Sequence, residues 1–224
     1  MLNPTQKKTV PAFWLLSLLD IIGILSKFSI LHYITKPLLI PTLILLLFFT
    51  DTALAGKKLL LTGLFFSWLG DIFLLLESKQ ALFFIFGLVC FLTTHIFYII
   101  YFLSIRSANN SLLKKQPLFL LLVLGYGATL VWLLFPHLGD LKVPVIIYAT
   151  VICGMLLCSL HVFLKLKKPA NSFYLLGASL FVLSDSLLAI NKFYQAFAFA
   201  AVFIMLTYCA AQYFIVSGFI NQDK

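Results

Sequence analysis

The sequence predicts an all-α protein, a polytopic membrane helix bundle of eight transmembrane helices arranged as two parallel four-helix halves. Three observations lead to this prediction. Of the 224 residues, 62% are hydrophobic and only 10% are charged, well outside the composition of soluble domains. Apolar stretches of roughly 18 to 25 residues, long enough to span a bilayer, recur along the whole chain. One segment of the first half also reappears in the second half.

The apolar stretches place the eight helices in order, separated by short segments that hold nearly all the Lys and Arg residues. The first stretch follows basic residues as a secretory signal would, but Asp20 interrupts it and no small-residue cleavage site follows, so we interpret it as a span. No soluble domain remains, which predicts one integral membrane domain over 1–224 with internal halves at approximately 1–110 and 111–224. The expected spans are 11–30, 37–54, 59–76, 81–104, 117–135, 143–164, 172–190 and 194–219.

The net charge of +9 reports topology rather than a nucleic-acid partner, because the basic residues are divided between the two sides of the membrane. With eight spans both termini share one side. Eleven of the sixteen basic residues lie on that side: Lys7, Lys8, Lys57, Lys58, Arg106, Lys114, Lys115, Lys165, Lys167, Lys168 and Lys224. The other side holds Lys27, Lys36, Lys79, Lys142 and Lys192. We therefore expect both termini in the cytoplasm, with the chain in the inner membrane if the source is bacterial, and no nucleic acid among its partners.

The cysteine and histidine residues do not form a metal-ligand pattern. The four cysteines all lie in apolar runs without CxxC spacing, and the four histidines are scattered over loops and spans. The sequence predicts neither a disulfide framework nor a metal site.

An internal repeat relates the third and seventh spans. The run "GLFFSWLGDIFLL" from Gly63 matches "GASLFVLSDSLLA" from Gly177 at an offset of 114 residues, which places Asp71 on Asp185. Four helices separate the two copies, so both cross the membrane in the same direction, as in parallel halves related by an axis along the membrane normal. Each carboxyl group then lies roughly 8 Å below the non-cytoplasmic boundary, at matching depths.

The two aspartates are the strongest candidates for function. An ionised carboxylate in hydrocarbon costs a few kcal/mol or more, so such residues are retained for a reason. Ser67, Gly63 and Gly70 form a stripe of small and polar residues beside Asp71 that should face other helices. We expect the carboxylates to face a shared cavity. The alternative is that each bonds to a neighbouring Ser, Tyr or Lys and only holds the bundle together.

Several other polar residues lie in or next to the spans. Lys36, with Pro37 at the expected first turn of the second helix, either binds phosphate or tunes a carboxylate, or it anchors the helix at the interface. Tyr148 lies at the depth of the aspartates, whereas His95 lies roughly 13 Å deeper. Asp20 has no counterpart in the repeat and either pairs locally or lines the cavity. The predicted substrate-binding residues are Lys36, His95, Tyr98, Tyr148, Tyr208 and Gln212.

The motifs "GLFFSWLGD", "THIFY", "KP", "VPVIIY", "LGASLFVLSDSLLA" and "YCAAQYFI" resemble those of the YhhN-like membrane proteins, the lysoplasmalogenase family. The resemblance covers nearly the whole chain in the expected order. It implies a cofactor-free hydrolase that cleaves the vinyl ether bond of lysoplasmalogens, lysophospholipid substrates, to a fatty aldehyde and glycerophosphoethanolamine or glycerophosphocholine. Such hydrolysis needs an acid and a base, and the hypothesis is that Asp71 and Asp185 are this catalytic pair.

Two other functions fit part of the pattern. A proton-coupled transporter of a small molecule or lipid also uses parallel repeats and buried carboxylates. However, no helix is broken by Gly or Pro near its midpoint at corresponding places in the two halves. A metal-dependent hydrolase built on His95 would need more ligands at one depth than the sequence offers. The oligomeric state is left open by the sequence.

Overall fold

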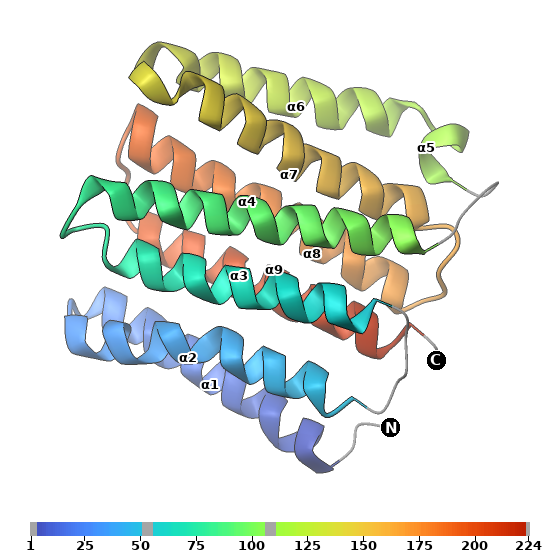
Figure 1. Ribbon diagram of the computed structural model, residues 1–224, viewed down its shortest axis with the longest axis horizontal. Helices are drawn as coiled ribbons and strands as arrows, with labels where there is room; N and C mark the ends of the chain where they lie inside the picture. The colour runs from blue at the N-terminus through green and yellow to red at the C-terminus, as the bar shows by residue number, and fades with distance from the viewer. Residues whose placement is uncertain (1–3, 51–55, 106–110, 223–224) are drawn as a thin grey trace. The chain divides into compact units, whose positions relative to one another are not determined.

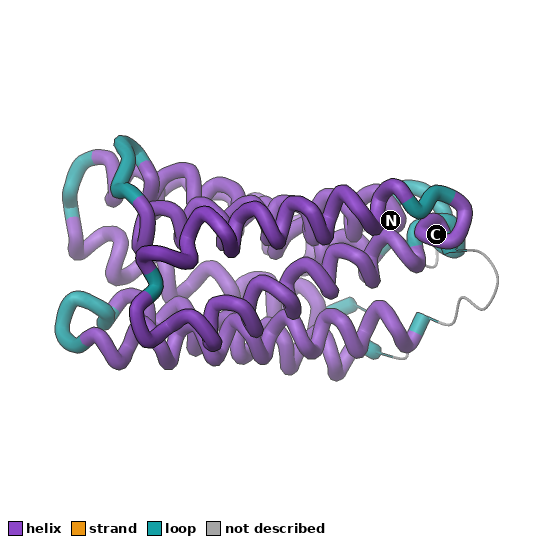
Figure 2. The backbone as a smooth tube through the Cα atoms, turned by 90° about the horizontal axis from the view of Figure 1, so that it is seen from above, coloured by secondary structure: helices purple, strands orange, loops and turns teal. Residues whose placement is uncertain are grey.

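The computed structural model describes residues 4–50, 56–105 and 111–222, with side chains from Lys8 onward, and all regular structure in these ranges is helical (Figures 1 and 2). Eight of the helices are long and apolar enough to cross a membrane, which confirms the predicted all-α membrane bundle. These are α1 (Pro4–Leu25), α2 (Ser29–Phe48), α3 (Lys57–Leu75), α4 (Ala81–Ser104), α6 (Leu118–Leu134), α7 (Lys142–Val162), α8 (Ala170–Ala189) and α9 (Ala200–Ile220).

Short elements connect or extend the spans. A single turn, α5 (Leu112–Lys115), precedes α6, and two 3-10 turns (Phe135–His137 and Gly139–Leu141) join α6 to α7. A π-helical turn, Ile190–Tyr194, extends α8, and α9 begins only at Ala200, six residues later than expected. The last residues of the expected second span, 51–54, lie outside the described residues.

The expected start of the second helix was wrong. Helix α2 begins at Ser29, so Lys36 is its eighth residue and Pro37 lies in the interior rather than in the first turn. Helix α1 correspondingly ends at Leu25 instead of 30, and a short turn at Ser26–Phe28 reverses the chain. The turn uses a left-handed backbone at Lys27, with φ of 56°. An interior proline normally destabilises a helix because it leaves a backbone carbonyl oxygen without its hydrogen-bond donor. We therefore expect another group to donate to that oxygen.

Trp68 of α3 supplies such a contact. Pro41 has no N–H to give to the carbonyl oxygen of Pro37 four residues earlier, so that oxygen loses its intrahelical donor. The indole Nε1–H of Trp68 donates to it at 2.9 Å. In membrane helices, prolines are tolerated where neighbouring helices satisfy the freed backbone groups in this way. The bond also fixes the packing of α2 against α3.

The substitution Trp68→Phe is expected to destabilise the protein by about 1–3 kcal/mol, because it leaves the partly buried Pro37 carbonyl without a donor. Thermal unfolding in detergent measures the change. In a Pro41→Ala background, the new Ala N–H can bond to Pro37, so the same Trp68→Phe change should cost less. Equal losses of stability in both backgrounds would show that Trp68 does not compensate for the N–H that Pro41 lacks.

The chain divides into two compact units, Met1–Tyr101 and Phe102–Lys224. Within each unit, the helix that carries an aspartate packs closely on the span that follows it. A Cβ atom on Gly63 of α3 would lie 2.6 Å from the Tyr98 ring and 3.5 Å from Phe97 of α4, and one on Gly177 of α8 would lie 3.0 Å from the Ala211 carbonyl of α9. Position 97 falls on 211 at the offset of 114, so these helix pairs agree with the sequence repeat. The relation between the predicted halves stays a prediction.

Candidate functional site

Asp71 lies on the buried face of α3. Asp71 is only 1% exposed. Gly63, Ser67 and Gly70 are also buried on this helix, which confirms that the stripe of small and polar residues faces the interior. Four residues separate Asp71 from the end of α3, and four separate Asp185 from the end of α8. Each aspartate therefore lies about 6 Å from the end of its α-helix. The π-helical turn extends the helix of Asp185 to Tyr194, so the matching depths stay a prediction.

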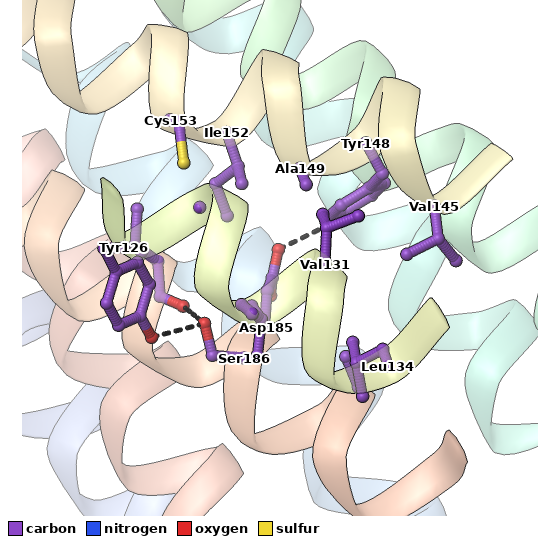
Figure 3. Close-up of a pocket in the computed structure, with 14 residues that line it drawn as sticks. Tyr126, Val131, Leu134, Val145, Tyr148, Ala149, Ile152, Cys153, Asp185 and Ser186 are labelled. Atoms are coloured by element: carbon purple, nitrogen blue, oxygen red, sulfur yellow. Dashed lines mark hydrogen bonds between the residues drawn. The ribbon is translucent and has the colours of Figure 1, made fainter. Parts of the chain in front are cut away.

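Asp185 is partly buried and has a tyrosine partner on the neighbouring helix. The hydroxyl group of Tyr148, the seventh residue of α7, donates to Asp185 Oδ2 at 2.5 Å (Figure 3). A hydrogen bond this short to a carboxylate is charge-assisted and holds both side chains in one orientation. The pair thus aligns one carboxylate oxygen of Asp185 with a hydrogen-bond donor.

The Asp185–Tyr148 pair lines a small cavity of about 40 Å³ between α6, α7 and α8 (Figure 3). Its wall is mainly apolar, with Tyr126 and Ser186 as the other residues bearing hydroxyl groups. Tyr126 donates to Ser186 Oγ at 2.8 Å, and Ser186 donates in turn to the carbonyl oxygen of Val182 at 2.6 Å. The sequence-based prediction missed both residues, although Ser186 adjoins the repeated aspartate and Tyr126 interrupts an apolar run between two glycines.

A larger apolar groove between α6 and α7 borders this cavity. Its volume is about 430 Å³. The residues that line both the cavity and the groove are Gly127, Val131, Ala149 and Cys153. On α7 the groove runs from Ile146, near Tyr148, to Leu157, so it extends from the level of Asp185 by several helical turns toward the other end of α7.

Lys36 lies at the level of Asp71 within the first unit. Two hydrogen bonds bracket it on α2: the Tyr33 hydroxyl donates to the carbonyl oxygen of Leu75 at 3.2 Å, and Trp68 donates to that of Pro37. Leu75 and Trp68 lie on either side of Asp71 in α3. The Lys36 residue is 9% exposed. Lys36 and Asp71 therefore lie at similar levels of two neighbouring helices, and the role of Lys36 stays a prediction.

The other predicted substrate-binding residues lie deeper in their units. His95 and Tyr98 are fully buried on α4, where the adjacent Thr94 donates to the Gly63 carbonyl oxygen at 3.0 Å. Gly63 precedes Asp71 by eight residues, or about 12 Å along an α-helix. Tyr208 and Gln212 are buried on α9, and neither lines the cavity at Asp185.

Among the described residues, no group of three or more His, Cys, Asp or Glu side chains could hold a metal ion.

Comparison with known proteins shows the same similarity as the motifs. The family model of the YhhN family matches residues 31–219. Two curated relatives named lysoplasmalogenase, from Mycobacterium bovis (strain ATCC BAA-935 / AF2122/97) and Mycobacterium tuberculosis (strain CDC 1551 / Oshkosh), are each 32% identical over 139 residues. The match covers 61% of this chain and 51% of each relative, so the chain spans about half the length of the curated relatives it matches. No solved structure gives a significant match.

Proposed function

Because this chain belongs to the YhhN family, we propose that it is a membrane hydrolase that cleaves the vinyl ether bond of lysoplasmalogens to a fatty aldehyde and glycerophosphoethanolamine or glycerophosphocholine. The observation that carries the proposal is the hydrogen-bonded Asp185–Tyr148 pair in a cavity that borders an apolar groove (Figure 3). A lipid with one hydrocarbon chain and a polar head has the complementary form. The name of the two relatives supports the same substrate class.

The chemistry requires one group that gives a proton and one that takes a proton. Protonation of the double-bond carbon gives an oxocarbenium-like cation, water attacks this cation to form a hemiacetal, and the hemiacetal collapses to aldehyde and alcohol. In the proposed mechanism, Asp185, held as a hydrogen-bond acceptor by Tyr148, takes the proton from water and offsets the positive charge. Asp71 supplies the proton to carbon. Glycoside hydrolysis meets a similar cation with two carboxyl groups.

Each unit by itself offers one proposed contact with the substrate, an apolar one in the second unit and a basic one in the first. The hydrocarbon chain occupies the groove between α6 and α7, which passes Gly127 and Ala149. The phosphate of the head group contacts Lys36, which shares the level of Asp71 in its own unit. His95, Tyr98, Tyr208 and Gln212 stay predicted substrate contacts.

The proposal is tested by incubating the purified protein in detergent with lysophospholipids that contain or lack the vinyl ether, while free aldehyde is measured. Release of aldehyde from the vinyl ether lipids alone is expected. Because transport needs two compartments and hydrolysis does not, aldehyde release also separates the enzyme from a proton-coupled transporter. Absence of aldehyde from every lipid, with protein that is folded, would refute the hydrolase.

Tyr148→Phe is expected to lower kcat about tenfold or more, with a smaller change in KM, because a hydrogen bond to a charged group contributes about 1.5–3 kcal/mol. Initial rates of aldehyde release over a range of lysoplasmalogen concentrations give both constants. Tyr194→Phe is the matched control, since Tyr194 is 45% exposed in the π-helical turn that extends α8. An unchanged kcat in Tyr148→Phe would remove the tyrosine from the mechanism.

A further inference from the structure

A second polar cluster lies between α1 and α2 of the first unit, apart from the Asp185 cavity. Asp20 of α1 is fully buried, and its Oδ1 atom accepts hydrogen bonds from His32 Nδ1 at 2.9 Å and from Thr35 Oγ1 at 2.7 Å, both on α2. Its Oδ2 atom is also buried and has no hydrogen-bond partner within the described ranges. The sequence-based prediction placed His32 in a loop, so this cluster appears only once α2 is known to begin at Ser29.

The contacts of Asp20 fix the orientation of the His32 ring. A carboxylate only accepts hydrogen bonds, so the Nδ1 atom of His32 must carry the hydrogen that it shares with Asp20. The His32 side chain is 23% exposed, whereas Asp20 is fully buried. Nε2, on the other edge of the ring from Nδ1, is therefore the ring nitrogen available to a ligand. In a protonated ring, Nε2–H is a donor suited to an anion.

Lys36 lies one helical turn from His32 on the same side of α2, at the i and i+4 positions. His32 and Thr35 mark the face of α2 that contacts α1, and Tyr33 and Pro37 mark the face that contacts α3. Lys36 falls between these two faces on the helix, so its side chain projects toward the seam bounded by α1 and α3.

The surroundings of Lys36 indicate an anionic ligand. The residue is 9% exposed, and no hydrogen bond, ion pair or ring contact to it exists within the part of the chain that the structure describes. The ammonium nitrogen does not belong to the buried side-chain atoms that lack a partner in the described ranges, so it stays accessible although most of the side chain is covered. An anion that reaches this nitrogen would gain a charge-assisted hydrogen bond. His32 and Lys36 can together donate to two oxygen atoms of one phosphate group.

The positions of His32 and Lys36 along α2 suit contact with one phosphate group near Asp71. His32 and Lys36 lie about 4.5 and 10.5 Å from the first residue of α2, by the helical rise per residue. Asp71 lies about 6 Å from the corresponding end of α3, so the two side chains bracket its level within the first unit. A phosphate between them would lie close to the level of Asp71.

We propose that His32 and Lys36 form the binding site for the phosphate group of the lysophospholipid, and that Asp20 and Thr35 are positioning residues that hold the His32 ring toward it. The identity of the lipid as a lysoplasmalogen rests on the proposed function, but binding of the phosphate does not require turnover. The inference therefore adds three residues, Asp20, His32 and Thr35, to the contact already proposed for Lys36.

A kinetic experiment compares two vinyl ether substrates, one with the phosphocholine head group and one that is a 1-alkenylglycerol without phosphate. His32→Gln and Lys36→Gln are each expected to raise the ratio of the KM for the phospholipid to the KM for the alkenylglycerol about tenfold, the loss of one charge-assisted hydrogen bond. Asp20→Asn should raise this ratio by about threefold, because it only loosens the ring. If these residues had a purely structural role, both KM values would change by the same factor and their ratio would stay constant. That result would overturn the proposal.

A binding experiment keeps the inference testable if no turnover is found. Thermal unfolding in detergent compares stabilisation by lysophosphatidylcholine, which has no vinyl ether, with stabilisation by a monoacylglycerol of the same chain. The phospholipid is expected to raise Tm more than the monoacylglycerol does in the wild-type protein, and His32→Gln should abolish the difference. His137→Gln, at an exposed histidine of the 3-10 turn after α6, is the matched control and should keep it.

Two outcomes of the binding experiment overturn the inference. Equal stabilisation of the wild-type protein by the two lipids would exclude phosphate recognition. Stabilisation by inorganic phosphate alone, at the level reached with the phospholipid and lost in His32→Gln, would assign the site to free phosphate instead of a lipid head group.

Discussion

Asp71→Asn and Asp185→Asn are each expected to lower the rate of aldehyde release from a lysoplasmalogen by about a hundredfold to ten-thousandfold, the usual contribution of a positioned general acid or base. Asparagine keeps the shape of the side chain but can neither give nor take the proton at the reacting atom. The Asp185→Asn side chain can still accept the hydrogen bond from Tyr148, so packing of α7 on α8 should persist. Initial rates at saturating lipid measure the effect.

The control for the loss of one carboxylate is Asp140→Asn, which removes an exposed acidic residue of the 3-10 turn before α7. This variant should keep the wild-type rate. Monodisperse elution in detergent and an unchanged Tm establish that the aspartate variants are folded. Retained activity in both aspartate variants would defeat the assignment.

The double variant tests whether the two carboxylates act on one substrate. Residues that act as a unit are strongly non-additive, so Asp71→Asn with Asp185→Asn should be only slightly slower than the slower single variant. If the rate loss in the double variant equals the product of the two single-variant losses, the two carboxylates act at separate sites. This measurement addresses the expectation that Asp71 and Asp185 face a shared cavity, which otherwise stays a prediction.

The number and order of the spans were predictable because the length of an apolar stretch can be read directly along the sequence. A bilayer demands about 20 apolar residues for each helix and places charge at the ends, and neither demand depends on which helices touch. The buried stripe of Ser67, Gly70 and Asp71 was predictable for a related reason: the periodicity of one helix determines which residues share a face. The tyrosine at the depth of Asp185 was found by counting residues in the same way.

The start of α2 and the polar clusters depend on contacts between helices, which the sequence pattern does not contain. Pro37 was expected at a helix start because the donor that compensates the Pro37–Pro41 pair, Trp68, lies on another helix. The same error concealed the bond between Asp20 and His32. Residues 31–36 were expected to form a loop, so His32 could not be assigned to a face of a helix. Ser186 escaped notice because its partner, Tyr126, is 60 positions away in the sequence.

A substitution at Gly127 is expected to close the passage between the Asp185 cavity and the groove. A Cβ atom at Gly127 would lie 2.8 Å from Cys153 Sγ, whereas a Cβ atom at Gly125, two residues earlier on α6, would meet nothing within 4 Å. Gly127→Leu should therefore lower kcat/KM about tenfold or more for a long-chain lysoplasmalogen, because the added side chain fills the space shared by cavity and groove. Gly125→Leu is the matched control, since both changes remove a helix-interior glycine and its backbone freedom.

The chain length of the substrate distinguishes a blocked passage from a damaged α6–α7 packing. If Gly127→Leu blocks the path of the hydrocarbon, the loss of kcat/KM should shrink as the alkenyl chain is shortened, whereas a packing defect would affect all chain lengths alike. Cys153→Ala offers a second check, because without Sγ the nearest atom to a Cβ at Gly127 is the Cβ of residue 153, at 4.0 Å. Any stability lost in Gly127→Ala should therefore return in Gly127→Ala with Cys153→Ala. A chain-independent loss in Gly127→Leu, or an equal loss in Gly125→Leu, would place the hydrocarbon chain elsewhere than this groove.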